Sequence, residues 1–286
     1  FLGGVVLSYT RWFLLVRAVE LPFRYRDAVR LGFIGTLFNF VIPGAIGGDF
    51  VRAAYLCREQ GRRTRPIATV VVDRLAGLLG LFGLASLAGT LGWSRLELPV
   101  RGLVTAAWIA VGVTAGILML AFLPGLGRGD SRRRAELATV GASYRRRIWA
   151  LPLAAMFGLV THNLNVLAFY TLGQALFGDV PALVDHFLIV PLVLFSTAIP
   201  LPLGALGVSE QVSANLFHLA SFQGGAVVMM TFRLLQLGGA LLGAGVFFAN
   251  AAQVRALTAT TEHLEEPLGE DTNPSTDPGH VLPDTP

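Results

Sequence analysis

The stretch FVIPGAIGGDFVRA, residues 40–53, decides how the rest of this sequence is interpreted. It lies in an apolar region, yet it holds helix-breaking and charged residues, namely Pro43, Gly44, Gly47, Gly48, Asp49 and Arg52. Irregular backbone at membrane depth is tolerated only where protein buries it or where it lines a water-filled cavity. Ionisable side chains at that depth are costly, so they are candidates for function.

The composition is that of a polytopic membrane protein. Of the 286 residues, 53% are hydrophobic and 14% are charged, whereas about a quarter of the residues of a soluble domain are charged. The 22 Lys-plus-Arg residues are all Arg, and they lie mostly in short segments between apolar stretches. This pattern is typical of topology signals and of contact with anionic lipid, and it argues against nucleic acid as a partner.

The two ends of the chain differ in character. It begins with Phe1 and is apolar at once: residues 2–19 are a candidate span, and we expect one or more spans to precede it. Residues 256–286 hold seven acidic residues, several Pro and no Arg, which predicts a disordered acidic tail after a membrane domain at 1–255. A single cysteine, Cys57, excludes an internal disulfide.

A second stretch, TAIPLPLGALGVSE at residues 197–210, resembles the first. Each has Ile-Pro, then glycines, then an acidic residue. Each also precedes a span with an Arg-Leu pair within the membrane: Arg74 lies 31 residues after Pro43, and Arg233 lies 33 residues after Pro200. The predicted backbone breaks are at Pro43, Gly44, Pro200 and Pro202, because Pro removes a helical hydrogen bond.

Three predicted spans, 66–93, 102–123 and 148–177, separate the two stretches, and an odd number reverses the direction of the second. We therefore predict an all-α transmembrane bundle with two inverted-topology repeats, at about 20–93 and 178–250. Each repeat contains a Pro/Gly-broken re-entrant helix hairpin, and such breaks usually build a shared site near the membrane centre.

Arginine is unevenly distributed between the loops on the two sides of the predicted bundle. Segments 20–30, 58–65 and 124–147 hold fourteen Arg, whereas those at 94–101, 178–181 and 221–224 hold two. This asymmetry predicts a multi-pass protein of the cell membrane whose Arg-rich segments are cytoplasmic.

Charged residues predicted at membrane depth form the candidate binding site. Arg74 and Arg233 start 8 and 9 residues inside their spans, so each reaches roughly 12–14 Å into the bilayer and the two could meet near its centre. We predict that Asp49 or Asp73 pairs with Arg74 and that Glu210 pairs with Arg233. Amides at the starts of the half-helices, Gly47–Asp49 and Gly207–Ser209, would add partial positive charge.

Such a cavity suits an anionic headgroup, most simply a phosphate. Structural salt bridges between hairpins and spans are the alternative. For His162, Asn163 and Asn165 the commoner use is hydrogen bonding between helices, and Arg11 with Trp12 also fits an anchor at the membrane interface. The sequence has no motif for a catalytic site, a metal or a cofactor.

Three pieces together carry a resemblance to a known family. They are Asn39-x-x-x-Pro43 with Gly47-Gly48-Asp49-x-x-Arg52, then Asp73-Arg74, then Gly204-x-x-Gly207-x-x-Glu210. With these the chain resembles the lysylphosphatidylglycerol synthase transmembrane-region family, which is flippase-like. The family includes the membrane half of the multiple peptide resistance factor and archaeal proteins related to dolichol-phosphate sugar transfer.

The resemblance implies a lipid translocase acting on membrane lipids, either an anionic or aminoacylated phospholipid or a polyprenyl phosphate. The soluble aminoacyl-transferase domain of the full-length enzymes has no counterpart here, so we do not expect lysyl transfer. A membrane-embedded transferase or accessory subunit for a lipid-phosphate sugar stays an alternative, as does a small-anion transporter. A homodimer and a partner synthase or glycosyltransferase are also left open.

Overall fold

The described part of the chain is helical apart from short connections, as predicted. This computed structural model describes residues 1–42, 46–60, 63–96, 98–122, 132–197 and 206–250. Four of its helices are long and apolar enough to cross a membrane, which takes about 20 residues. They are α4 (Thr64–Leu91), α5 (Leu98–Phe122), α7 (Ala150–Phe177) and α11 (Gly225–Ala249).

Shorter helices pack around these four. They are α1 (Leu2–Ala18), α2 (Tyr25–Val41), α3 (Gly47–Gln60), α6 (Arg132–Arg146), α8 (Leu183–Thr197) and α10 (Val208–His218), with a 3-10 turn, η2, at Trp93–Arg95. The sequence predicted a span at 2–19, but α1 has only 17 residues and is not one of the four helices of spanning length.

Both predicted helix interruptions are present. The first falls between Val41 at the end of α2 and Gly47 at the start of α3. In the second, Gly207 directly before α10 has φ +84°, so no helix continues through it into Val208. In the first, Pro43 disfavours helix at the preceding residue, and Ile42 is extended. Pro43, Gly44, Pro200 and Pro202 themselves lie outside the described residues.

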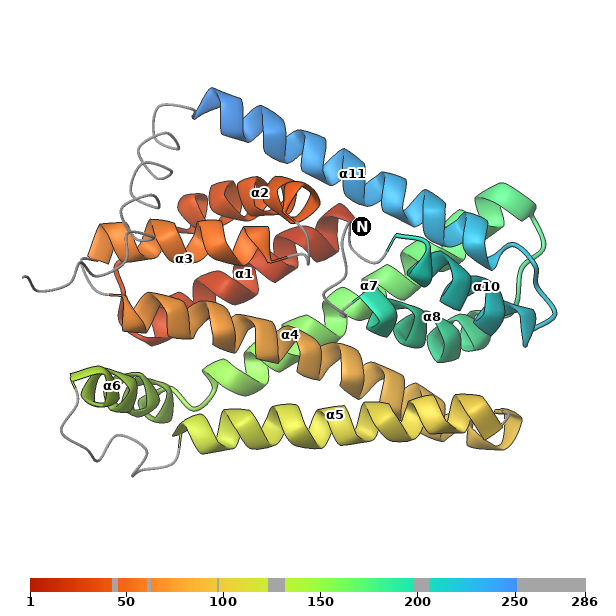
Figure 1. Cartoon of the computed structure of the whole chain (residues 1–286), viewed down its shortest axis with the longest axis horizontal. Coiled ribbons are helices and arrows are strands. Elements are labelled where there is room, and N and C mark those ends of the chain that lie inside the picture. Colours follow the sequence, from red (N-terminus) through yellow and green to blue (C-terminus); the bar gives the residue numbers. More distant parts are fainter. Residues whose placement is uncertain (43–45, 61–62, 97, 123–131, 198–205, 251–286) are drawn as a thin grey trace, which may run out of the picture.

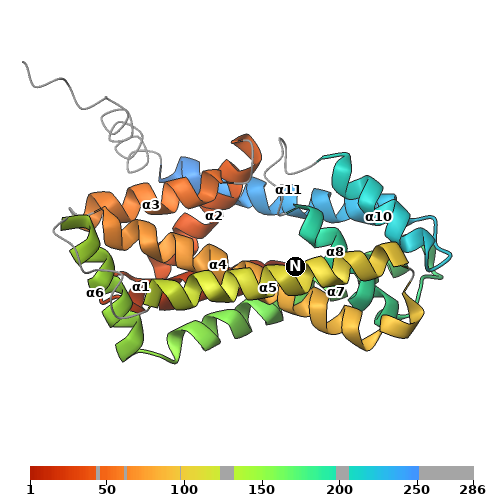
Figure 2. The ribbon, with the colours of Figure 1, turned by 60° about the horizontal axis from the view of Figure 1, so that its bottom comes forward.

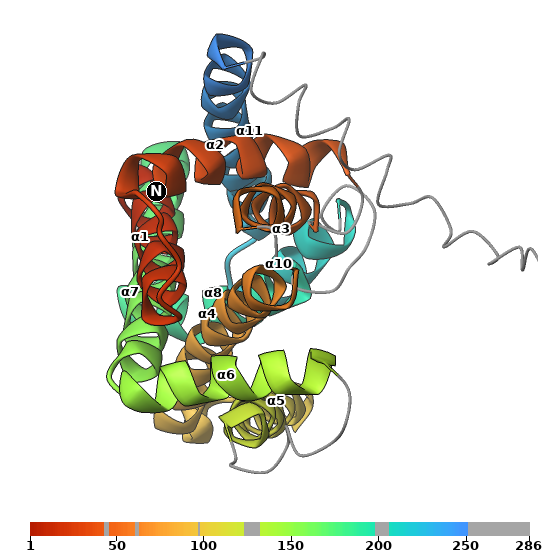
Figure 3. The same cartoon turned by 90° about the vertical axis from the view of Figure 1, so that its left-hand side faces the viewer.

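The two interrupted helix pairs lie toward opposite ends of the long helices (Figure 1). The pair α2/α3 lies at the end that also holds α6, and the pair α8/α10 lies at the other end. Figure 3 shows α3 nearly end-on while α2 lies across it, so these two helices cross at a steep angle. Helix α2 also packs against α11, so an early helix and the last described helix of the chain lie in contact.

Some glycines bring helices of the bundle into close contact. A Cβ at Gly80 of α4 would lie 2.6 Å from the backbone carbon of Gly158 in α7. A Cβ at Gly243 of α11 would collide with the carbonyl oxygen of Phe33 in α2. Small residues of this kind let helix backbones approach closely within a membrane.

The Arg-rich segment after α5 was treated as a loop in the sequence, and here the prediction was wrong in part. Residues 132–146 form α6, which packs against α4 and α5. Arg, Ala and Glu all have good helix propensity, so a charged surface helix is favourable here. Tyr144 anchors it, because this buried side chain donates a hydrogen bond of 3.1 Å to the carbonyl of Leu15.

Candidate functional site

A cavity of about 370 Å³ lies between α1, α2, α3, α4, α7 and α11. Among the described residues, its charged lining consists of three guanidinium groups and two carboxylates, a formal excess of one positive charge. These side chains are Arg11, Asp49, Arg52, Asp73 and Arg74. All five were singled out in the sequence, and four of them belong to two of the three motifs that carry the family resemblance.

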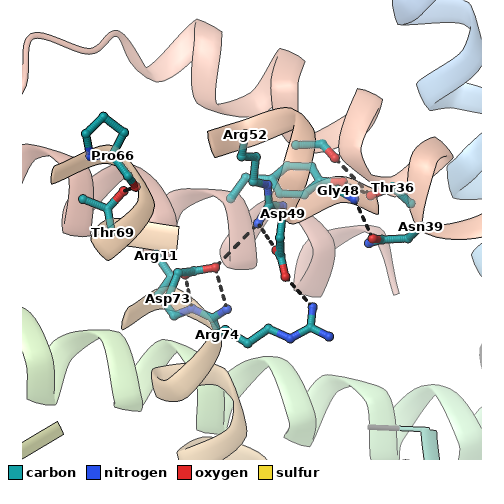
Figure 4. Close-up of polar contacts among 12 residues, drawn as sticks. Arg11, Thr36, Asn39, Gly48, Asp49, Arg52, Pro66, Thr69, Asp73 and Arg74 are labelled. Atoms are coloured by element: carbon teal, nitrogen blue, oxygen red, sulfur yellow. Dashed lines mark hydrogen bonds and ion pairs between the residues drawn. The ribbon is translucent and has the colours of Figure 1, made fainter. Parts of the chain in front are cut away.

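Asp73 on α4 is the centre of this charged group (Figure 4). Arg11 of α1 donates to both of its carboxylate oxygens, at 2.7 Å through Nε and at 3.3 Å through Nη2. Arg52 of α3 lies 3.5 Å from the second oxygen. The Asp73 side chain is 5% exposed, so one buried carboxylate holds together three separate helices.

Asp49 continues the chain of charges toward the open part of the cavity. It accepts a hydrogen bond of 2.6 Å from Nη1 of Arg74, and Arg52 lies 4.0 Å from its other oxygen. The predicted pairing of Arg74 is therefore confirmed, with Asp49 as its partner. The Arg74 side chain is 40% exposed, so it is the most accessible cation of the group.

Arg52 also contacts two aromatic rings. Its guanidinium carbon lies 5.1 Å from the Trp12 ring centre and 5.6 Å from that of Tyr9, within the range of a cation–π interaction. Trp12 is fully buried, and Arg11 lies in the cavity, so the interpretation of this pair as a membrane-interface anchor is wrong.

The helix break positions α3 and its charges. Asn39 near the end of α2 accepts a hydrogen bond of 2.8 Å from the amide of Gly48. A Cβ at Gly48 would lie 2.6 Å from the carbonyl oxygen of Gly35, and one at Gly47 would collide with that of Phe38. The two glycines therefore allow the start of α3 to lie directly on α2, which points Asp49 and Arg52 at α4.

A second, separate charged group lies at the start of α10. Glu210 accepts a hydrogen bond of 2.7 Å from Nε of Arg233 and one of 2.6 Å from the Gly207 amide. Ser209 accepts from Nη2 of Arg233 at 2.6 Å. Gly207 has φ +84°, which favours glycine. The predicted pair of Glu210 with Arg233 is confirmed.

The charged group around Asp73 and the one around Glu210 do not form one site, although the estimated depths of Arg74 and Arg233 suggested that these two side chains could meet. Within the described residues, the lining of the cavity includes Phe232 and Gln236 but not Arg233. The amides of Gly48 and Gly207 were expected to bind a ligand. Each donates instead to a protein side chain, so neither is available in this conformation.

The polar residues of α7 differ in whether they line the cavity. His162 lines the cavity, and its Nε2 lies 3.3 Å from the carbonyl of Gly77 on α4. Asn163 donates to the carbonyl of Leu159 within α7 at 2.7 Å, and it does not line the cavity. Sequence reasoning missed Tyr9 and Thr36, whose hydroxyl oxygens lie 2.6 Å apart at the cavity wall. No sequence motif marks that pair.

Comparison with known proteins places the chain in a family. The family described as lysylphosphatidylglycerol synthase TM region matches residues 1–243, which is most of the chain. The protein therefore belongs to the lysylphosphatidylglycerol synthase transmembrane-region family, as the three motifs indicated. No curated protein and no solved structure matched it.

Proposed function

We propose that this protein is a lipid translocase whose Arg-lined cavity binds the anionic headgroup of a phospholipid or a polyprenyl phosphate. The observation that carries the proposal is a cavity of about 370 Å³ whose lining has one more guanidinium than carboxylate. Guanidinium groups bind phosphate oxygens through short, charge-assisted hydrogen bonds. Arg74 is the group that would meet the headgroup first, because its side chain is the most exposed of the three.

A purely structural network accounts less well for this arrangement. Ion pairs that only tie helices together gain from being packed and balanced, since leaving buried charge uncompensated is destabilising. Here the charges border open space, and their sum is positive. The wall opposite adds neutral hydrogen-bonding groups from α7 and α11, among them Thr161, Asn165 and Gln236. A ligand with a phosphate beside polar groups would use both walls.

The membrane arrangement we propose follows from the two interrupted pairs. Pair α2/α3 would enter from the cytoplasm and pair α8/α10 from the outside, as inverted repeats. Their positions toward opposite ends of the long helices support this (Figure 1). The Arg-rich segments 20–30, 58–65 and 124–147 would then be cytoplasmic in the cell membrane, and lipid would reach the cavity between the repeats.

A flipping assay tests the proposal. Purified protein is placed in liposomes with fluorescent phosphatidylglycerol, and a reagent that does not cross the membrane quenches the lipid in the outer leaflet. The rate at which the remaining fluorescence is lost then measures flipping. Loss of a hydrogen bond to a charged group costs about 1.5–3 kcal/mol, so Arg74→Gln should slow flipping about tenfold or more. Arg58→Gln is the matched control, because Arg58 is exposed on α3 and outside the cavity lining.

Three results would contradict the proposal. The first is wild-type flipping by a correctly folded Arg74→Gln variant. The second is exchange of radiolabelled phosphate without any lipid movement, which would indicate a small-anion transporter. The third is product formation from a lipid-phosphate sugar by the purified protein, which would indicate a transferase.

A further inference from the structure

A second cavity lies on the opposite side of α4 from the charged one. It measures about 620 Å³, and its lining is almost entirely aliphatic. Helices α5 and α7 both pack on α4, and α6 packs across α4 and α5 at one end; Figure 2 shows α5 in front with α6 at that end. The floor of this groove is formed by Ala76 and Leu79 of α4.

The groove is distinct from the charged cavity. Within the described residues the two share no lining residue, although Ala76 and Gly77 are neighbours on α4. The close crossing of α4 and α7 at Gly80 and Gly158 lies between them. A molecule in the groove is therefore a different molecule from a headgroup bound by Arg74, and its binding does not depend on the proposed translocation.

Of the described residues, one with a charged side chain lines the groove, and it lies at the end occupied by α6. Arg145 is in the last turn of α6, is exposed and lines the groove beside Ile148 and Leu151. Its neighbours Arg146 and Arg147 make this end of the bundle strongly basic. An aliphatic slot with a guanidinium at its mouth matches a molecule with a hydrocarbon chain and an anionic head.

We propose that the groove between α4, α5 and α7 is a binding site for one acyl chain of an anionic phospholipid, whose phosphate is bound by Arg145. The surrounding bilayer is as apolar as the groove, so burial of the chain alone does not select a lipid. Selection comes from the headgroup, because a guanidinium forms charge-assisted hydrogen bonds with a phosphate that it contacts directly. The bound lipid would fill the space behind the part of α4 that carries Asp73 and Arg74.

The site can be measured directly on purified protein. The full chain is reconstituted in nanodiscs of equimolar phosphatidylglycerol and phosphatidylcholine, then transferred to detergent, and retained lipid is counted by native mass spectrometry. The count is made in the Arg74→Gln background, so that a lipid bound in the charged cavity does not contribute, and there we expect one retained phosphatidylglycerol. Arg145→Gln should reduce the preference for phosphatidylglycerol about tenfold, because it removes a hydrogen bond to a charged group, whereas the control Arg146→Gln, whose residue does not line the groove, should reduce it much less.

Filling the groove provides a second test. Ala155→Phe places a ring inside it and should abolish retention, whereas Met156→Phe, on the exposed side of the same helix, should not. Retention by a folded Ala155→Phe protein would overturn the proposal, and so would loss of the lipid in Arg74→Gln, which would place it in the charged cavity.

A third measurement needs no variant and remains decisive if Ala155→Phe does not fold. Phosphatidylglycerol with a photoreactive group in its acyl chain should label residues 115–120 of α5 and 151–155 of α7. Labelling confined to other helices, or equal labelling by phosphatidylcholine, would overturn the proposal.

Discussion

Asp73 neutralises two buried guanidinium groups, so its replacement by Asn tests the charge network of the cavity. In the native protein this carboxylate binds Arg11 through two oxygens and lies 3.5 Å from Arg52. Asn keeps the size of the side chain and removes its charge. Both arginines would then be buried together without their shared counter-ion.

The structure gives an estimate of the loss. Removing one partner of a buried ion pair costs about 3–5 kcal/mol, because the remaining charge is left uncompensated. The side chains of Arg11 and Asp73 are 8% and 5% exposed, so the upper half of that range applies. Arg11→Gln should cost less, because Asp73 would keep Arg52 as a partner.

The assay is reversible unfolding in mixed micelles by increasing SDS, followed by tryptophan fluorescence. Asp27→Asn is the matched control: its pair with Arg30 spans 3.2 Å within one helix turn, with side chains 26% and 22% exposed. Such a pair contributes about 0.5 kcal/mol. The double variant Arg11→Gln with Asp73→Asn should lose less than the sum of its single variants, by about 0.5–3 kcal/mol.

The reasoning would be refuted if Asp73→Asn lost no more stability than Asp27→Asn. Additive losses in the double variant would also refute it, since they would show that Arg11 and Asp73 do not stabilise each other. In either case the cavity lining would not be a coupled network.

Two further predictions concern the helix breaks. Gly48→Ala should lower stability by about 1–3 kcal/mol, because its Cβ would lie 2.6 Å from the Gly35 carbonyl; Gly83→Ala, where a Cβ meets open space, should be neutral or stabilising in the same SDS titration. Glu210→Gln should cost about 3 kcal/mol, since it pairs with the buried Arg233, yet a folded fraction should still flip lipid at the wild-type rate.

Much of the architecture could be predicted because its signals are local. Apolar length defines α4, α5, α7 and α11, and Ile-Pro followed by glycines marks each interruption. A carboxylate partner for Arg74 was also predictable, with Asp49 as one of two candidates, because Asp49 and Arg74 lie at similar distances from the connection between α3 and α4 and so at similar depth. These inferences need only periodicity, segment length and the order of elements.

The other contacts of the site depend on how each helix is rotated about its own axis, which cannot be read from this one sequence. Depth along the membrane suggested that Arg74 and Arg233 could meet, but it does not say which way each side chain points. Arg11 and Asp73 are 62 residues apart, and an Arg beside a Trp near the start of a chain is equally typical of an interface anchor. The apolar groove between α5 and α7 leaves no sequence signal, because its residues are the same types that face lipid elsewhere.

The central claim is that the Arg-lined cavity binds an anionic headgroup, and the most direct test is an electron cryo-microscopy map of the protein in nanodiscs rich in phosphatidylglycerol. The account predicts phosphate density inside the cavity, within about 3.2 Å of a guanidinium nitrogen of Arg74 or Arg52. Well-resolved water alone in that cavity, with headgroup density only on the outer surface of the bundle, would contradict it.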